Sequence, residues 1–170
     1  MQVDAHVTFA QDWDIDIIQQ LEATNNEMAV LSTYLSDISG ALDPVTGYSK
    51  IKTRPIMCNT DYETDVQGSH LRHRSQPERL PTIKDMPQMQ PFWAAGFSFS
   101  RGHFVVNVPY DLYQPMIFQG EESSIGIRAF TYGYDHYAPQ RSICFHTYAS
   151  GHEERNKVPH FWQHAQKYQG

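Results

Sequence analysis

The first third of the chain shows the periods of a strand, a helix and a second strand. Over Val3–Phe9, apolar residues at odd positions alternate with polar residues at even positions, which predicts a strand buried on one face. Between Asp14 and Glu22 apolar residues recur at helical spacing, and acidic residues occupy the first turn, where the helix dipole favours them. Ala29–Leu35 is rich in residues that favour strands and predicts a second strand.

The second half of the chain predicts a hairpin followed by a helix. Phe92–Phe99 alternates again, and Phe104–Val108 follows turn residues at Arg101–Gly102, so the two segments predict paired strands. Glu121–Tyr132 has apolar residues at helical spacing. Gly133 follows it, which predicts that the helix ends in a left-handed cap.

Between these halves, residues 50–91 contain several prolines and little sustained periodicity. A cluster of basic residues and histidines lies at His70–Arg74. Long loops in compact domains are uncommon and often functional, so this segment predicts a partly ordered loop or lid. The basic cluster has no assigned role at this stage, because loops also carry such clusters for solubility.

Ser142–Tyr148 predicts a last short strand. The tail from Gly151 is polar, with Phe161 and Trp162 as an expected docking point. Taken together, the elements predict one α/β domain over residues 1–170, with a mixed sheet and flanking helices.

Composition narrows the classes of partner. The net charge is −6 with neutral histidines, so the long-range field repels nucleic-acid phosphates and anionic lipid, and we expect neither partner. The apolar runs are far shorter than the roughly 20 residues of a bilayer-spanning helix. Cys58 and Cys144 form no Cys-x-x-Cys pair, which argues against a disulfide scaffold or a zinc knuckle and favours a reducing, cytoplasmic location.

The first candidate for chemistry is the pair Asp4 and His6. Residues two apart in a strand leave the same face about 6.5–7 Å apart, close enough for their tips to converge on one ion. The alternative is that a surface strand merely exposes two polar side chains. The pair alone is therefore a weak signal for a metal site.

Two further candidates lie later in the chain. Glu121 and Glu122 open the expected helix, where one acid serves as a cap and the other faces a cation, a hydroxyl group or solvent. His146 lies on the small-residue face of the last expected strand, where a lone histidine is usually structural. If it meets Asp4 and His6, the three form a carboxylate and two imidazoles, a set that suits a manganese-like or zinc-like ion.

With these segments in order, the chain resembles the carboxy-terminal part of the N-acetylglucosaminyltransferases typified by the enzyme that modifies hydroxyproline on the Skp1 protein. The similar stretches cover most of the chain outside residues 50–91 and the tail. They are Val3–Phe9 with Asp12–Asp14, Ala94–Phe99, Val108–Asp111, Phe118–Glu122 through Arg128, and Phe145–His146.

The resemblance implies a glycosyltransferase-A fold, in which an Asp-x-His element holds Mn²⁺ or Mg²⁺ on the diphosphate of a UDP-sugar. It implies that Asp4 and His6 are metal ligands, with His146 as the third. It also implies that Glu121 and Glu122 contact the acceptor or the sugar. The expected reaction is transfer of N-acetylglucosamine from UDP-N-acetylglucosamine to a hydroxyl acceptor, such as one on a protein, with retention at the anomeric carbon.

Two residues are expected on the donor side. Gly96 would let backbone approach the donor, although a sheet glycine equally often accommodates packing. Trp93, like Tyr110, would stack on a sugar ring, with an ordinary core aromatic as the alternative.

Only three residues precede Asp4, whereas in this fold the nucleotide is gripped mainly by elements that precede the Asp-x-His strand. We therefore expect residues 1–170 to be a partial catalytic domain. The alternative function is a sugar- or nucleotide-sugar-binding module of the same fold without turnover. A metal hydrolase ranks last, because the chain has no His-x-x-x-His helix or similar signature.

Overall fold

The computed structural model describes residues 1–65, 68–77, 86–113 and 119–148. The elements within these ranges are β1 (Gln2–Val3), β2 (Val7–Phe9), α1 (Trp13–Ala23), β3 (Ala29–Ser32), α2 (Ile38–Ala41), β4 (Thr60–Asp65), β5 (Gly68–His73), β6 (Gln88–Gln90), β7 (Phe97–Ser100), α3 (His103–Asn107), α4 (Glu121–Thr131), β8 (Asp135–Ala138) and β9 (Cys144–His146). None of these helices is long and apolar enough to cross a membrane.

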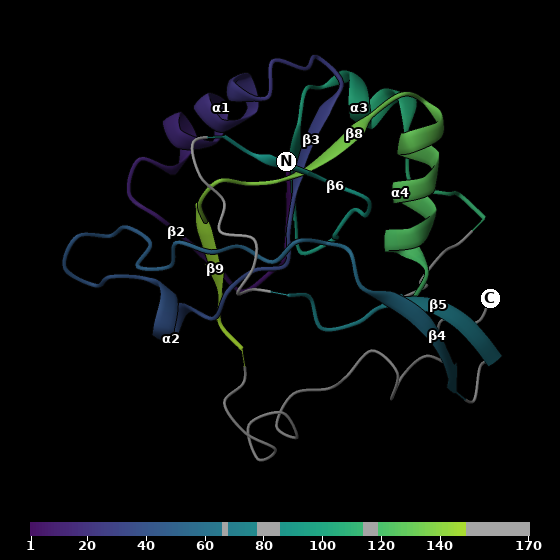
Figure 1. Ribbon diagram of the computed structural model, residues 1–170, viewed down its shortest axis with the longest axis horizontal. Helices are drawn as coiled ribbons and strands as arrows, with labels where there is room; N and C mark the ends of the chain where they lie inside the picture. Colours follow the sequence, from purple (N-terminus) through teal and green to yellow (C-terminus); the bar gives the residue numbers. More distant parts are fainter. Residues whose placement is uncertain (66–67, 78–85, 114–118, 149–170) are drawn as a thin grey trace.

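The centre of the molecule is a five-stranded mixed sheet in the order β1-β7-β3-β8-β6. β3 pairs in parallel with β8, whereas β7 is antiparallel to β1 and β3, and β6 is antiparallel to β8. Two small sheets flank it, β2 with β9 and the hairpin β4–β5 (Figure 1). The expected class, a mixed sheet with helices in one α/β arrangement, is confirmed.

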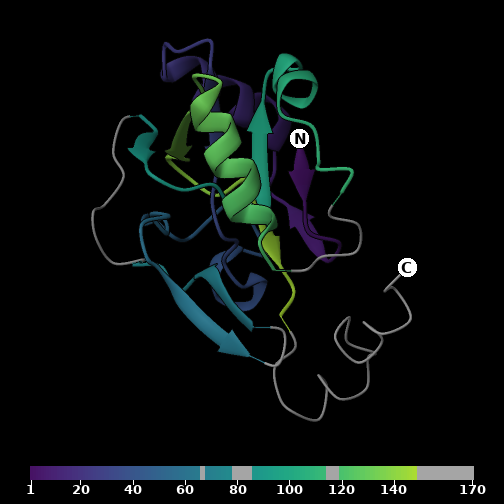
Figure 2. The same ribbon diagram turned by 90° about the vertical axis from the view of Figure 1, so that its right-hand side faces the viewer.

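Side chains of β3 alternate between two cores because successive residues of a strand point to opposite faces. Ala29 and Leu31 join a core with Ile17 and Leu21 of α1. Val30 points the other way and packs with residues of α3 and α4, including Ile125. The sheet therefore lies between α1 on one face and α3 with α4 on the other, and the two views agree on this arrangement (Figures 1 and 2).

The helix α4 ends as the sequence predicts. Gly133 has a φ of 87°, in the region that side chains other than glycine rarely adopt. Its N–H donates to the carbonyl of Phe130, and the N–H of Tyr134 donates to the carbonyl of Ala129, the pattern of a Schellman cap. This cap turns the chain directly into β8, a strand that the sequence analysis did not predict.

The hairpin predicted for Phe92–Phe99 and Phe104–Val108 is wrong. Only Phe97–Ser100 is a strand, and the second segment is the helix α3. Phe104 and Val108 are both buried, four residues apart on one side of a helical turn, while Val105 and Val106 face solvent. Burial on one side of a helical turn outweighs the preference of valine for strands.

The single strand predicted for Val3–Phe9 is also wrong, because it is broken at residues 4–6. β1 belongs to the central sheet and β2 to the small sheet with β9, so Asp4 and His6 lie on the connection between two sheets. They therefore do not share a strand face as the alternation predicted.

Residues 50–91 are more ordered than expected, since they include the β4–β5 hairpin and β6. The helix predicted over Asp14–Glu22 is α1, which extends one residue further at each end. The strands predicted over Ala29–Leu35 and Ser142–Tyr148 are β3 and β9, which are shorter than predicted. Phe161 and Trp162 lie outside the described residues.

Replacing Gly133 with alanine tests the cap. A methyl group there meets no atom within 4 Å, so the cost is the backbone conformation alone. We expect the free energy of unfolding to fall by about 1–2 kcal/mol in chemical denaturation. Gly40→Ala is the control, because Gly40 is equally open but does not have a positive φ, and its substitution should leave stability unchanged or slightly raised. Equal effects of both substitutions would contradict the cap.

Candidate functional site

A cleft of about 660 Å³ lies where the carboxyl end of β3 meets the amino end of α4 and the β4–β5 hairpin. Figure 1 shows the hairpin beside the lower end of α4. In α/β sheets, ligands commonly bind beyond the carboxyl ends of the strands. The side chains and backbone that line the cleft come from Asp4, Tyr34, Leu35, Leu71, Arg72, His73, Arg74, Ser75, Ala95, Gly96, Gln119, Gly120, Glu121, Glu122, Ser123 and Tyr148.

Glu122 is held by groups from two other elements. The backbone N–H of Ala95 donates to its Oε1 at 2.9 Å, and the hydroxyl of Tyr34 donates to its Oε2 at 2.9 Å. Burial, and then the negative charge of Glu122, raise the pKa of Tyr34, so the phenol stays protonated as a donor. The carboxylate therefore has a fixed orientation at the first turn of α4.

The neighbouring carboxylate has a separate network. Glu121 Oε1 accepts from the hydroxyl of Tyr110 at 2.8 Å and from Nε2 of Gln2 at 3.2 Å. The Tyr110 hydroxyl also contacts Gln2 Oε1. Partial burial and the bond to Glu121 raise the pKa of Tyr110. The two adjacent acids are thus bonded by different partners, and both line the cleft.

Asp4 directly follows β1 and bonds at the cleft to the loop that precedes β7. Its N–H donates to the carbonyl of Gly96 at 3.1 Å. A Cβ at Gly96 would lie 3.2 Å from Asp4 Oδ2, so the absence of a side chain makes room for this carboxylate. Ser32 fixes the same loop, because its hydroxyl accepts from the N–H of Ala94 and lies 3.0 Å from the carbonyl oxygen of Phe97.

His146 lies beside Asp4. Its Nε2 is 3.9 Å from Asp4 Oδ2, and its ring centroid is 6.1 Å from that of His6 in an edge-to-face arrangement. β9 brings it there, because His146 pairs with Val7 in the ladder between β9 and β2. The structure therefore gathers the three expected metal ligands in one region, although they come from a loop and a strand and not from two strand faces.

Asp4 and His146 have a separation that suits a shared ion. Two atoms bound to one ion at about 2.0–2.2 Å are at most about 4.4 Å apart, and the 3.9 Å between Oδ2 and Nε2 falls within this limit. In the parts of the chain that the structure describes, no group of three or more His, Cys, Asp or Glu side chains is arranged to hold a metal ion. The three-ligand set remains a prediction.

The opposite wall of the cleft carries positive charge. Arg72 and Arg74 both bond to Oε2 of Glu63, at 2.8 and 3.2 Å, and their side chains are 44% and 38% exposed. The sequence analysis left this cluster unassigned. The hairpin places it in the same cleft as the amino end of α4, where the helix dipole also favours an anion.

Trp93 does not line this cleft. Its side chain is 1% exposed, and its indole N–H donates to Ser98 Oγ at 2.9 Å. Trp93 is therefore a core aromatic, the alternative that its sequence context left open. Tyr110 is exposed and acts on Glu121 through its hydroxyl.

Tyr34 and Gln2 are the residues that sequence reasoning missed. Tyr34 follows the buried strand β3 by two residues, so the only signal for it was its position after a strand end. Nothing in the sequence links it to Glu122, which is 88 positions away.

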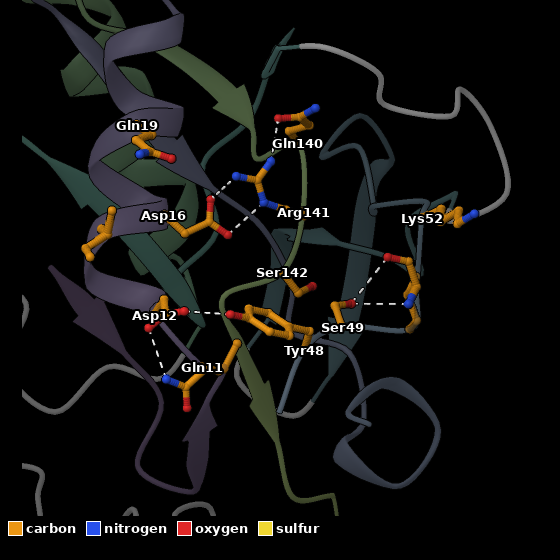
Figure 3. Close-up of a pocket in the computed structure, with 13 residues that line it drawn as sticks. Gln11, Asp12, Asp16, Gln19, Tyr48, Ser49, Lys52, Gln140, Arg141 and Ser142 are labelled. Carbon is orange, nitrogen blue, oxygen red and sulfur yellow. Dashed lines mark hydrogen bonds and ion pairs between the residues drawn. The ribbon is translucent and has the colours of Figure 1, made fainter. Parts of the chain in front are cut away.

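A second hollow of about 600 Å³ lies near the amino end of α1, away from these residues (Figure 3). Its two carboxylates already accept hydrogen bonds from neighbouring side chains. Asp12 accepts from the Tyr48 hydroxyl at 2.6 Å, which lowers the pKa of Asp12, and Asp16 Oδ2 accepts from Arg141 Nε at 2.7 Å. These bonds tie α1 to the segments around residues 48 and 141, so we assign this hollow a structural role.

Comparison with known proteins gives one positive finding. A model of the family described as Glycosyltransferase (GlcNAc) matches residues 1–170. No curated protein matches the chain.

The protonated state of Tyr34, which burial and the charge of Glu122 both favour, is testable by the dependence of stability on pH. Because folding raises the pKa of Tyr34, the unfolded chain loses this proton first as the pH rises past about 10. The contribution of Tyr34 to the free energy of unfolding is complete below pH 10 and declines above it. We expect the free energy of unfolding of Tyr34→Phe to fall less steeply between about pH 10 and 12 than that of the unmodified chain. Parallel curves in chemical denaturation at several pH values would contradict this assignment.

Proposed function

The chain belongs to the Glycosyltransferase (GlcNAc) family, and from this premise we propose that its cleft transfers N-acetylglucosamine from a UDP-sugar to a hydroxyl acceptor. The observation that carries the proposal is that Asp4, Gly96, Glu121 and Glu122 line one cleft, although up to 118 positions separate them. Three carboxylates and two guanidinium groups in one cleft suit a site that binds a charged donor and a polar acceptor.

The donor diphosphate is proposed to lie between the amino end of α4 and the arginines of the hairpin. The free N–H groups of the first helical turn and the charges of Arg72 and Arg74 would stabilise the negative charge that grows on the leaving diphosphate. Mn²⁺ or Mg²⁺, when bound, supplies further charge neutralisation there. Asp4 and His146 would hold it, with His6 as the third ligand after a change of rotamer.

The acceptor hydroxyl is proposed to lie beside Glu122. This carboxylate has both oxygens oriented by Ala95 and Tyr34, which fixes the direction in which its remaining lone pairs accept. It would orient the acceptor and steady the positive charge that develops at the anomeric carbon. For a retaining reaction, in which the leaving phosphate takes the acceptor's proton, Glu122 need not act as a base.

Three further assignments go with this proposal, namely the fold, the class of acceptor and the cellular location. We propose the glycosyltransferase-A fold, because an Asp-x-His element follows a strand of the central sheet and Asp4 lines the cleft. Acceptors of the hydroxyproline type are the first to test. We also propose a cytoplasmic location, since Cys58 and Cys144 are both free thiols.

Asp4→Ala tests the metal site. We expect the affinity for Mn²⁺ in calorimetry to fall by at least about 10-fold, with the thermal transition unchanged because this side chain is half exposed. Gly96→Ala should weaken Mn²⁺ binding in the same direction, since a Cβ there would displace the Asp4 carboxylate. Asp14→Ala is the control, because it removes an exposed carboxylate from α1 far from the cleft. Unchanged Mn²⁺ affinity in Asp4→Ala would remove the metal assignment.

Glu122→Gln tests the reaction itself. With UDP-N-acetylglucosamine, Mn²⁺ and hydroxyl-bearing peptides, we expect the chain to release UDP and form a glycosylated product detectable by mass spectrometry. The substitution should lower kcat/KM by about 100-fold while UDP affinity changes little, because the proposed role is on the acceptor side. Equal loss of UDP binding would place Glu122 on the donor. Binding of UDP-N-acetylglucosamine without any turnover would favour the non-catalytic module.

A further inference from the structure

A separate apolar pocket of about 570 Å³ opens beside the cleft and shares part of its wall. Four residues line both spaces, namely Leu71, His73, Glu122 and Ser123. Its volume lies within the range of ligand sites, about 300–1,000 Å³. The pocket therefore adjoins the point at which we place the acceptor hydroxyl.

The walls of this pocket are mostly aromatic or aliphatic. Ile127 and Phe130, on one side of α4, are 61% and 71% exposed, and Met89 of β6 is 59% exposed. Three large apolar side chains on a shared hollow are more than the scattered exposure that a protein surface normally shows. The remaining apolar and aromatic walls come from Leu71, Pro91, Phe92, Trp93 and Tyr134.

The described lining of the pocket contains no lysine or arginine, and its two carboxylates already accept hydrogen bonds. Glu122 is already bonded by two donors, and Asp135 Oδ2 accepts from Asn26 at 2.8 Å. Burial lowers the pKa of His136 to about 4, so this imidazole is neutral near pH 7. An anionic group would lose its hydration here without gaining a cationic partner, and the mostly apolar walls favour an apolar occupant.

Two buried histidines of the lining leave ring nitrogens without hydrogen-bond partners among the residues that the structure describes. His73 is 6% exposed and its Nε2 bonds to the carbonyl of Trp93 at 3.0 Å, while its Nδ1 has no partner. His136 is 3% exposed, and its Nε2 is likewise unpaired. Buried acceptors without partners cost about 1–3 kcal/mol each, and a donor such as a peptide N–H, but not an apolar side chain, would satisfy them.

The cleft has a second neighbouring hollow. This hollow of about 470 Å³ shares Tyr34, Leu35, Ser75 and Tyr148 with the cleft, and it shares no lining residue with the apolar pocket. Neighbouring hollows on a common cleft suit an extended chain better than a compact small molecule. An oligosaccharide is disfavoured in the apolar pocket, because its hydroxyl groups would find few hydrogen-bond partners there.

We propose that this pocket binds an apolar side chain of a peptide acceptor, adjacent in that peptide to the residue whose hydroxyl receives the sugar. The inference rests on the proposed function for the position of the hydroxyl. It adds a substrate class, a peptide with an aliphatic or aromatic residue next to the modified one.

The test uses matched synthetic peptides, each with one hydroxyl residue (serine, threonine or 4-hydroxyproline) and either leucine or alanine beside it. Fluorescence anisotropy without any donor measures binding, and UDP release without peptide measures donor hydrolysis. The test variant is Ile127→Ala with Phe130→Ala, two exposed positions whose truncation should not disturb the core. Tyr132→Ala is the control, because Tyr132 is 60% exposed at the end of the same helix but does not line the pocket.

Of the leucine peptides, we consider the one that binds the unmodified chain most tightly. We expect the unmodified chain and Tyr132→Ala to bind it at least about 10-fold more tightly than its alanine counterpart. The double variant should bring this ratio below about 3-fold and leave donor hydrolysis unchanged. No preference for leucine in the unmodified chain would overturn the proposal. So would a preference that persists in the double variant, or tighter binding of a chitin oligosaccharide than of either peptide.

These outcomes distinguish failure of the proposed peptide pocket from failure of the proposed transfer reaction. A leucine preference that depends on the pocket, in a chain that releases no UDP, would support the peptide site and remove the transferase assignment. Transfer to peptides with no dependence on the neighbouring residue would retain the transferase assignment and overturn the pocket.

Discussion

The site depends on the two hydrogen bonds to Glu122. One comes from the Ala95 N–H in the loop before β7, and the other from the Tyr34 hydroxyl just after β3. They join the amino end of α4 to two segments that are distant in the sequence but adjacent in the sheet. Because hydrogen bonds to a charged acceptor are about twice as strong as neutral ones, this carboxylate can hold the helix, the loop and the strand end in one geometry.

This arrangement offsets the electrostatic repulsion between the adjacent carboxylates of Glu121 and Glu122. Glu121 and Glu122 have separate donors, and the positive end of the α4 dipole faces both. The acids can therefore stay close together beside Asp4, with Arg72 and Arg74 on the facing wall. A polar cleft with both signs of charge and an apolar pocket then share a wall of four residues that includes Glu122, so this carboxylate lies between two environments that suit different parts of a substrate.

Gly96 and the loops of the site determine where its charged side chains lie. Gly96 leaves room for the Asp4 carboxylate, and Ser32 fixes the loop that carries Gly96. The break between β1 and β2 sends Asp4 toward the cleft and leaves His6 near His146. A continuous strand, as the alternation of Val3–Phe9 predicted, would keep the residues in one ladder and could not serve two sheets.

The sequence by itself determined the features that local physics controls. The helical period and Gly133 defined α4 and its cap, the acids of its first turn were identified from spacing, and the family likeness rested on short ordered motifs. Only the tertiary structure decided the rest. Whether Phe104–Val108 is helix or strand depended on which side chains the core buries, and the bond of Tyr34 to Glu122 crosses 88 positions. Local preferences amount to tenths of a kcal/mol per residue, whereas burial of a large side chain is worth about 1.5–3 kcal/mol, so packing wins where the two conflict.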